Sequence, residues 1–445
     1  MIQLPLEDYI VRYYILLFLS FLHIEANSTL PSWLDGKVWG NIRYYYIETN
    51  KNYIDSLQTS AHSNALGGQL HYTTNRLHGF QIQSTFMTTQ DFLLPDNVES
   101  STLGQDNPHL KLNPDDGYSV LGEISLDYKN KYLNLWYGRK VITTPMIGPK
   151  YVRMLPSAIQ GSCVTFFYNK NLKFNFLYAD KFKQRSSKKF TNLLEHALGT
   201  DTLSVTGKTK GETYTTSFIY NNRKHYYHLS NMYAPDFLNS FYFNVKLQKE
   251  LYSIAFELVS QNSVGNAKRN LAQASSITNG KKINAKAIGF QSIINYKQSS
   301  FDLVYRKILR NPNTYDSIIT PWDGSLLYAY SSTTNNLGQS LYGNALTAGG
   351  AYVGGTQGIK LGYTQKYNFL DLKGFKTHIA YAVYKNSLYR EDQEDLKVIF
   401  FYDYKKVSLQ LKGIWIDNDT YTFKNGTVNQ LDSLTQFHAI ATYKF

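Results

Sequence analysis

The chain is best understood from one stretch, Gly138–Gly161, which reads GRKVITTPMIGPKYVRMLPSAIQG. It contains four basic residues and three of the eleven prolines of the chain. Proline removes a backbone donor from a strand ladder, so no regular strand passes through the stretch. Both flanks, 131–139 and 161–168, nevertheless alternate as strands do. The sequence therefore predicts a stiff, basic loop between two strands, and our hypothesis is that it folds into the interior of a barrel and narrows a pore.

Outward from this loop, the chain resolves into segments of about ten residues in which apolar and polar side chains alternate. In one of them Phe80, Ile82 and Phe86 alternate with Gln81 and Gln83. In the segment 118–128, Val120, Ile124 and Leu126 alternate with Glu123, Ser125 and Asp127, which places Val120 on the apolar face. The predicted strands cover residues 38–47, 65–74, 79–89, 118–128, 131–139, 161–168, 172–179, 212–220, 225–233, 240–248, 252–260, 286–296, 301–309, 357–366, 376–386, 394–404, 406–416 and 435–445.

The connections between these segments alternate in length. Short polar turns, such as 129–131 and 169–171, alternate with long connections, such as 48–64 and 310–356. Antiparallel membrane barrels have short turns at one end and long loops at the other. This rhythm assigns 344–353 to a long loop rather than to a strand. We therefore predict an all-β fold, a transmembrane antiparallel β-barrel of about 18 strands, with both chain ends on the short-turn side and 138–161 as its third extracellular loop.

Both ends of the chain indicate export to the outer membrane. Ile15–Leu22 is a short apolar run, preceded by Arg12 and followed by a small residue at Ala26, which predicts a signal peptide over 1–26. The barrel domain is then 27–445. The final segment alternates and ends on Phe445, which predicts recognition by the barrel assembly machinery. The expected location is the bacterial outer membrane, in contact with lipid and lipopolysaccharide.

Composition narrows the function further. The net charge of +13 favours an anionic partner, and the basic run at 181–189 is interpreted as a loop facing lipopolysaccharide or solvent rather than nucleic acid. The single cysteine, Cys163, excludes an internal disulfide and a cysteine metal cage. The sequence contains no G-x-S-x-G, H-E-x-x-H or P-loop motif. We expect neither an enzyme nor a cofactor or metal site.

At this point the residues resemble a known family. Gly138, Thr144-Pro145, the run Arg153–Pro156 and Gly161 match the loop pattern of OprD-type outer-membrane porins, a family of substrate-specific 18-stranded porins. Weaker matches are NIRYYY at 41–46, GGQLHYTTNRLHGF at 67–80 and TPWDGSLLYAY at 320–330. The resemblance implies an inward third loop and a ladder of basic side chains that guides anionic groups. This chain has few arginines in its strands and so departs from the continuous arginine ladder of the family.

The phase of each strand separates lipid-facing from inward side chains. If the apolar face points to lipid, the inward strand charges are Arg43, Lys173, Lys246, Arg306, Lys360, Lys397, Lys412, Glu123, Asp127, Glu257 and Asp302. We predict that the constriction and its solute contacts comprise Lys140, Lys150, Arg153, Arg43, Arg306, Lys360, Lys412, Glu123, Asp127 and Asp302. The predicted framework of the constriction loop is Gly138, Pro145, Pro149, Pro156 and Gly161. The alternative is that these charges only solvate the lumen or pair with one another.

The sequence thus predicts a porin: a water-filled channel for passive diffusion of small hydrophilic solutes, with preference for anionic or carboxylate-bearing molecules such as amino acids. A barrel-based adhesin that acts through the long loops at 90–117 and 310–356 is the alternative. Whether the protein is a monomer or a homotrimer is left open.

Overall fold

The computed structural model describes residues 34–53, 58–92, 97–98, 100–101, 104–105, 110, 116–150, 152–198, 211–267, 281–324, 352–370, 372–388, 391–417 and 431–445. The predicted signal peptide lies outside these residues. The domain boundary predicted at residue 27 is therefore still a prediction.

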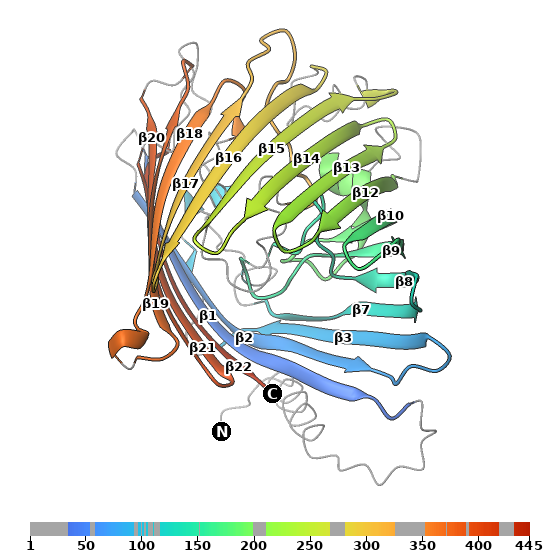
Figure 1. Ribbon diagram of the computed structural model, residues 1–445. Helices are drawn as coiled ribbons and strands as arrows, with labels where there is room; N and C mark the ends of the chain where they lie inside the picture. Colours follow the sequence, from blue (N-terminus) through green and yellow to red (C-terminus); the bar gives the residue numbers. More distant parts are fainter. Residues whose placement is uncertain are drawn as a thin grey trace.

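Eighteen long antiparallel strands form one closed barrel (Figure 1). They are β1 Lys37–Tyr53, β2 Gln58–Thr73, β3 Phe80–Gln90, β7 Tyr118–Lys129, β8 Leu133–Lys140, β9 Ala158–Phe167, β10 Leu172–Lys183, β12 Thr213–Asn221, β13 His225–Ala234, β14 Leu238–Gln248, β15 Tyr252–Ser263, β16 Asn284–Tyr296, β17 Ser299–Ile308, β18 Gln357–Lys366, β19 Phe375–Lys385, β20 Gln393–Tyr404, β21 Val407–Asp417 and β22 Leu431–Lys444.

A few short elements accompany the barrel. They are β4 Asn97–Val98, β5 Ser100–Ser101, β6 Gly104–Gln105, β11 Thr191–Asn192, the helix α2 Leu193–Leu198 and the 3-10 turn η2 Asn368–Leu370. Among the described residues, no helix is long and apolar enough to cross a bilayer.

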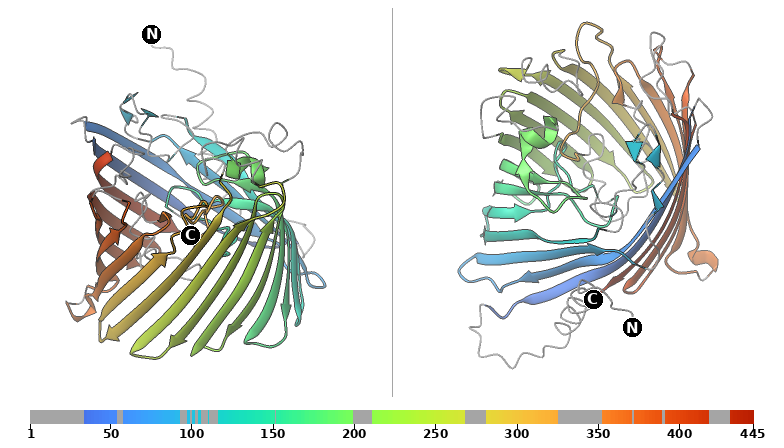
Figure 2. Two further views of the ribbon diagram at one scale, coloured as in Figure 1. Left: turned by 90° about the horizontal axis from the view of Figure 1, so that it is seen from above. Right: turned by 180° about the vertical axis from the view of Figure 1, so that it is seen from behind.

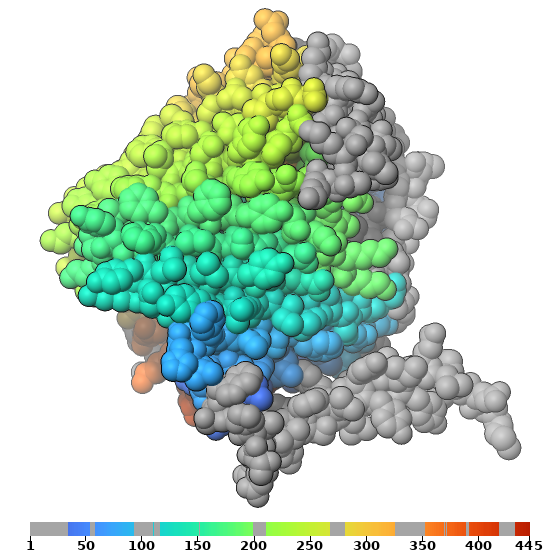
Figure 3. Space-filling model, turned by 90° about the vertical axis from the view of Figure 1, so that its right-hand side faces the viewer, coloured from blue at the N-terminus to red at the C-terminus, as the bar shows by residue number. Residues whose placement is uncertain are grey.

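The barrel closes between its first and last strands. β1 pairs with β22 from Asn41–Lys444 to Tyr53–Leu431. Next to the first of these pairs, the backbones of Gly40 and Phe445 exchange hydrogen bonds of 3.2 and 3.1 Å. Closure pairs both edges of each of the eighteen long strands in the described part of the chain. A lipid environment would not tolerate an unpaired edge. Viewed from the side, the wall is continuous (Figure 3).

Apolar side chains are exposed on the outer surface of the barrel and charged side chains are buried inside it, the opposite of a soluble protein. On β17, Phe301 and Leu303 are 51% and 40% exposed on the outer surface, whereas Asp302 and Arg306 are 5% and 1% exposed on the inner one. The same alternation recurs around the wall, as expected for strands that face lipid on one side. The structure therefore confirms the predicted transmembrane barrel and its strand phase.

Two local predictions were wrong. The connection predicted over 48–64 is mostly strand, because polar residues there continue the β1–β2 ladder through Glu48–His62 to Asn52–Gln58. The loss of apolar alternation had hidden these strand ends. In β7, a bulge at Gly122 shifts the register and turns Val120 inward, although the pattern placed it outward.

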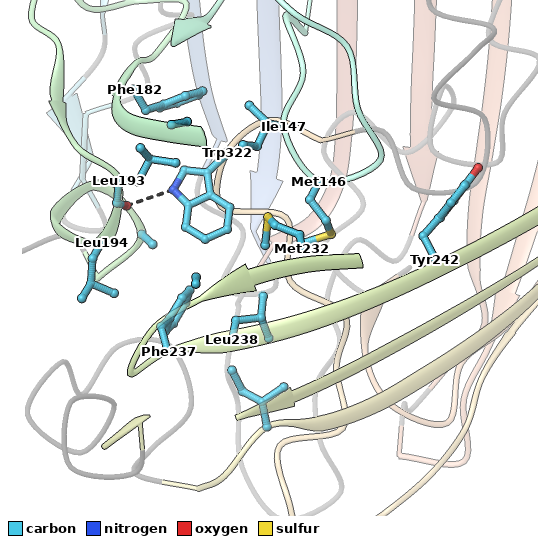
Figure 4. Packing of buried hydrophobic residues seen from close by; sticks show 14 of the residues in the cluster. Met146, Ile147, Phe182, Leu193, Leu194, Met232, Phe237, Leu238, Tyr242 and Trp322 are labelled. Atoms are coloured by element: carbon cyan, nitrogen blue, oxygen red, sulfur yellow. Dashed lines mark hydrogen bonds between the residues drawn. The ribbon is translucent and has the colours of Figure 1, made fainter. Parts of the chain in front are cut away.

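Part of the barrel interior is packed as a protein core. In the view from behind, α2 and the connections 141–157 and 309–324 lie within the ring of strands (Figure 2, right). Trp322, fully buried, stands at the centre of an apolar cluster with Phe237, Leu193 and Ile147 (Figure 4). Its indole Nε1 donates to the carbonyl of Leu193 at 2.9 Å. The cluster fixes three connections against one side of the wall.

Candidate constriction site

The loop between β8 and β9 is folded inward, as the sequence predicted. Its first half reaches across the interior to the connection after β17, where Ile147 forms bridges with Trp322 and Asp323. Gly148 N donates to the Trp322 carbonyl at 3.0 Å. A tight turn closed by Thr144, whose N–H donates to the Ile147 carbonyl at 2.8 Å, shapes this half of the loop.

Asp323 holds the second half of the loop. Its carboxylate accepts a hydrogen bond of 2.5 Å from the Ser157 hydroxyl and one of 2.9 Å from Arg185. Lys150 Nζ lies 3.4 Å from the same carboxylate. Burial alone would raise the pKa of Asp323, but Lys150, Arg185 and the Ser157 hydroxyl together hold it below its ordinary value. Asp323 is therefore a charged anchor in the interior.

The tip of the loop is tied to β1. The Tyr45 hydroxyl donates to the Val152 carbonyl at 3.1 Å, and Arg43 donates to the Arg153 carbonyl at 3.3 Å. Tyr45 also lies 2.7 Å from His438 Nδ1 on β22. These contacts place the guanidinium of Arg43, which is half-buried, beside the tip that carries Arg153.

The root of the loop is held by two acidic residues of β7. Glu123 accepts a hydrogen bond of 2.8 Å from the backbone N–H of Val141, and Asp127 forms an ion pair with Lys140. Glu123 and Asp127 were predicted to contact solute. The structure brings both to the loop root.

The remaining predicted charges lie on β17, β18 and β21. Lys360 is fully buried and pairs with Asp302 at 2.9 Å. Arg306 is 1% exposed and its guanidinium lies 5.3 Å from the Tyr352 ring. Lys412, 8% exposed, is the ladder partner of His438 and interacts electrostatically with Arg153. The predicted set thus includes ion-paired residues and a group around Arg153, whereas Arg306 lies against an aromatic ring and Glu123 binds the backbone of the loop root.

Of the five framework residues, the two glycines lie in strands and the three prolines lie in the loop. Gly138 and Gly161 are direct ladder partners of β8 and β9, inside the strands rather than at their ends. A Cβ at Gly138 would overlap the backbone of Ile124 and one at Gly161 that of Tyr178, so the neighbouring strands need glycine at both positions.

The three prolines of the framework lie in the loop between these strands. Pro145 lies within the turn closed by Thr144. The carbonyl of Pro149 accepts the Ser157 N–H at 2.8 Å, and that of Pro156 accepts Lys183 Nζ at 3.1 Å. Their backbone carbonyls thus help to fix the loop.

Sequence reasoning missed four residues of this site: Ser157, Lys183, Arg185 and Asp323. Lys183 and Arg185 belong to the basic run that was expected to face lipopolysaccharide or solvent. Lys183 lies at the end of β10, where it is fully buried and its Nζ donates to the Pro156 carbonyl at 3.1 Å. The only sequence signal for Asp323 was the weak family match at 320–330.

Comparisons with solved structures identify the architecture. The chain resembles OccAB3 of Acinetobacter baumannii with a TM-score of 0.67, at 14% identity over 92% of this chain and 100% of that one. A BenF-like porin from Pseudomonas fluorescens gives a TM-score of 0.67, at 10% identity over 93% and 100% of the two chains. OpdK of Pseudomonas aeruginosa, solved with vanillate, gives 0.64, at 11% identity over 92% and 98%. No protein-family model and no curated protein matches the sequence.

These neighbours are porins of the OprD type, and the alignments span nearly all of both chains. At 10% to 14% identity, the likeness concerns the fold. The family resemblance in the sequence implies an 18-stranded closed barrel with an inward third loop, and the structure has this architecture. This chain therefore has the fold of the OprD-type outer-membrane porins.

Proposed function

We propose that the protein is an outer-membrane porin that lets small hydrophilic solutes diffuse passively, with preference for anionic, carboxylate-bearing molecules. The fold and its porin neighbours support the channel. The inward loop supports selectivity, because a loop that crosses the interior brings its charges close to any solute that passes.

The observation that carries the anionic preference is the group around Arg153. Arg153 and Lys412 interact as like charges, and Arg43 reaches the backbone of the same loop tip. Within the described part of the chain, no carboxylate lies within salt-bridge distance of Arg153 or Lys412. Two neighbouring positive charges without a carboxylate between them attract an anion.

The paired charges serve a different role in this proposal. Lys140 and Lys360 each have an acidic partner of their own, so these two pairs add little net charge to the interior. Lys150 shares Asp323 with Arg185, which leaves one net positive charge at that junction. A carboxylate is the favoured ligand because an arginine guanidinium can donate two parallel hydrogen bonds to it. The neighbour OpdK was solved with vanillate, whose carboxylate fits this class.

Planar-bilayer recordings of purified protein in a salt gradient test the proposal. We expect discrete conductance steps and a reversal potential that indicates anion selectivity. Arg153→Glu is expected to shift that potential toward cation selectivity while the folded barrel keeps its heat-modifiable gel mobility. Lys385→Glu is the matched control, because Lys385 is 69% exposed and pairs with Asp392.

The outcomes separate the parts of the proposal. Cation selectivity of the unaltered protein, or an unchanged reversal potential in Arg153→Glu, would refute the role of the Arg153 group. Complete absence of conductance would refute the channel and leave surface adhesion as the function to pursue.

A further inference from the structure

A chain of hydrogen bonds connects a histidine on the wall to the first residue of the inward loop. His71 Nδ1 on β2 lies 2.8 Å from the Thr85 hydroxyl on β3. Thr85 donates to Glu123 Oε2 at 2.6 Å, and Glu123 Oε1 accepts the Val141 N–H at 2.8 Å. His71, Thr85 and Glu123 are successive ladder partners, so the wall itself sets this alignment.

The donors and acceptors of this relay fix its proton positions. An ionised carboxylate only accepts hydrogen bonds, so Glu123 takes the single hydroxyl proton of Thr85. The Thr85 oxygen must then accept from His71, which places a proton on Nδ1 and leaves Nε2 as the basic nitrogen. Trp39 stacks on the imidazole at 5.2 Å with an interplanar angle of 8°, which holds the ring in this orientation.

A second proton on His71 would lie close to a carboxylate. Its side chain is 22% exposed, and its Nδ1 lies 3.9 Å from Glu123 Oε2. The other elements packed against it present neutral groups, Trp39 of β1 and Thr85 of β3. Beyond Glu123, the nearest inward-facing charges on β7 and β8 are Asp127 and Lys140, which pair with each other. The charge nearest to a protonated His71 is therefore a carboxylate.

We propose that His71 positions Glu123, and through it the root of the inward loop, and that acid strengthens this hold. Histidine side chains exchange their second proton between about pH 5 and pH 8. Protonation converts the neutral end of the relay into a cation facing Glu123, and it adds one positive charge to the interior. The inference rests on the proposed function in one respect, because it takes the loop to form the constriction of the channel.

His438 shows why His71 is the responsive histidine. His438 is fully buried and lies near Lys412 and Arg153, so a second proton there would add a third positive charge to the group. Both of its ring nitrogens already lie within hydrogen-bond distance of partners, Tyr45 and Gln436. A proton on His71 meets an anion instead.

Bilayer recordings in a fixed salt gradient between pH 8 and pH 5 test the proposal. In the unaltered protein, the anion-to-cation permeability ratio is expected to rise on the order of two- to threefold with acid, and fluctuation of the open current is expected to fall. His71→Gln keeps a hydrogen-bond donor but does not titrate. It should match the unaltered protein at pH 8 and show a smaller response to acid than the unaltered protein in both measurements. His78→Asn, in an exposed turn, is the control and should keep the full response.

Thr85→Val separates positioning from charge. It removes the relay but leaves His71 able to titrate, so acid should still raise the permeability ratio and should no longer quieten the current. If His71→Gln titrates like the unaltered protein, the proposal is overturned. If Thr85→Val still quietens in acid, the positioning role is overturned. Lack of anion selectivity at pH 8 in every variant would instead count against the proposed function, because the acid-dependent differences would remain measurable.

Discussion

The Ser157 hydroxyl donates a 2.5 Å hydrogen bond to the carboxylate of Asp323, a residue 166 positions further along the chain. Ser157 lies at the end of the inward loop and Asp323 in the connection after β17. Arg185, from the connection after β10, donates to the same carboxylate. One acidic side chain therefore joins three connections that enter the barrel from different sectors of the wall.

Replacement of Asp323 is the first test of this junction. Asp323→Asn keeps the shape of the side chain but leaves Arg185 and Lys150 without their counter-charge. Removing one member of a buried ion pair typically costs about 3 kcal/mol or more. We expect the barrel to assemble, the inward loop to loosen and the open-channel current to become noisier. Limited trypsin digestion should cleave the loop faster, since it contains Lys150 and Arg153.

Asp392→Asn serves as the control for that experiment. Its partner Lys385 is 69% exposed, and exposed ion pairs contribute about 0–1 kcal/mol. The current and the cleavage rate should therefore be unchanged. An equally quiet channel in Asp323→Asn would show that the apolar contacts alone hold the loop.

The pKa of Asp323 predicts how the channel responds to strong acid. Lys150, Arg185 and the Ser157 hydroxyl overcome the effect of burial and hold this pKa below its ordinary value. A carboxyl whose pKa is lowered on folding contributes stability above its unfolded pKa of about 4, and that contribution is lost as the pH falls through the folded value. The junction should therefore be intact at pH 5 and loosen only below about pH 4.

Current noise measured from pH 6 to pH 3 checks this expectation. In the unaltered protein, noise should rise only in the last part of that range. Asp323→Asn should be noisy at every pH, without an acid transition that can be assigned to this carboxyl. A rise in current noise already near pH 5 in the unaltered protein would contradict the depressed pKa.

The wall was predictable from the sequence, and the interior was not. Strand positions follow from alternation with a period of two, a local property that lipid contact makes strict, as in the Phe301–Arg306 segment. The prolines at 145, 149 and 156 correctly excluded a strand and indicated an inward loop. The partners of that loop depend on contacts between residues far apart in sequence. No local pattern links Asp323 to Ser157, or Tyr45 to Val152.

Bulges explain another part of the difference between the predicted and the observed side-chain positions. A bulge reverses the inward and outward assignment beyond it, so one extra residue at Gly122 was enough to misplace Val120. A register shift after Ala179 likewise turns Phe182 inward, into the apolar cluster. Charges predicted from phase alone were inward as expected, but phase does not specify pairing. Lys360 and Lys412 looked equivalent in the sequence, and only Lys360 has a carboxylate partner in the described part of the structure.

Gly362 provides a test of the paired wall that does not remove a charge. A Cβ at this position would overlap the Asp302 carboxylate, which the glycine allows to lie along the wall toward Lys360. Gly362→Ala should therefore displace Asp302 and leave Lys360 with a weakened partner. We expect a shift of the reversal potential toward greater anion selectivity, as in Asp302→Asn, and no further shift in the double variant. Additive shifts would mean that the two substitutions act independently.

Trp322 tests whether the apolar cluster or the Asp323 junction dominates the placement of the loop. Truncation of a buried tryptophan typically costs about 3–5 kcal/mol, whereas loss of one hydrogen bond costs about 1 kcal/mol. Trp322→Phe keeps most of the packing against Phe237 and loses the bond to the Leu193 carbonyl. We therefore expect Trp322→Ala to loosen the loop at least as much as Asp323→Asn does, and Trp322→Phe to do so only slightly.

The two substitutions should be compared by thermal unfolding, trypsin cleavage and current noise on the same preparations. Trp322→Ala should speed cleavage at Lys150, Arg153 and Arg185 together, because the cluster holds the connections that carry all three residues. Trp322→Phe should cleave at nearly the rate of the unaltered protein. If Trp322→Ala left the cleavage rate unchanged while Asp323→Asn raised it, the ionic junction and not the apolar cluster would hold the inward loop.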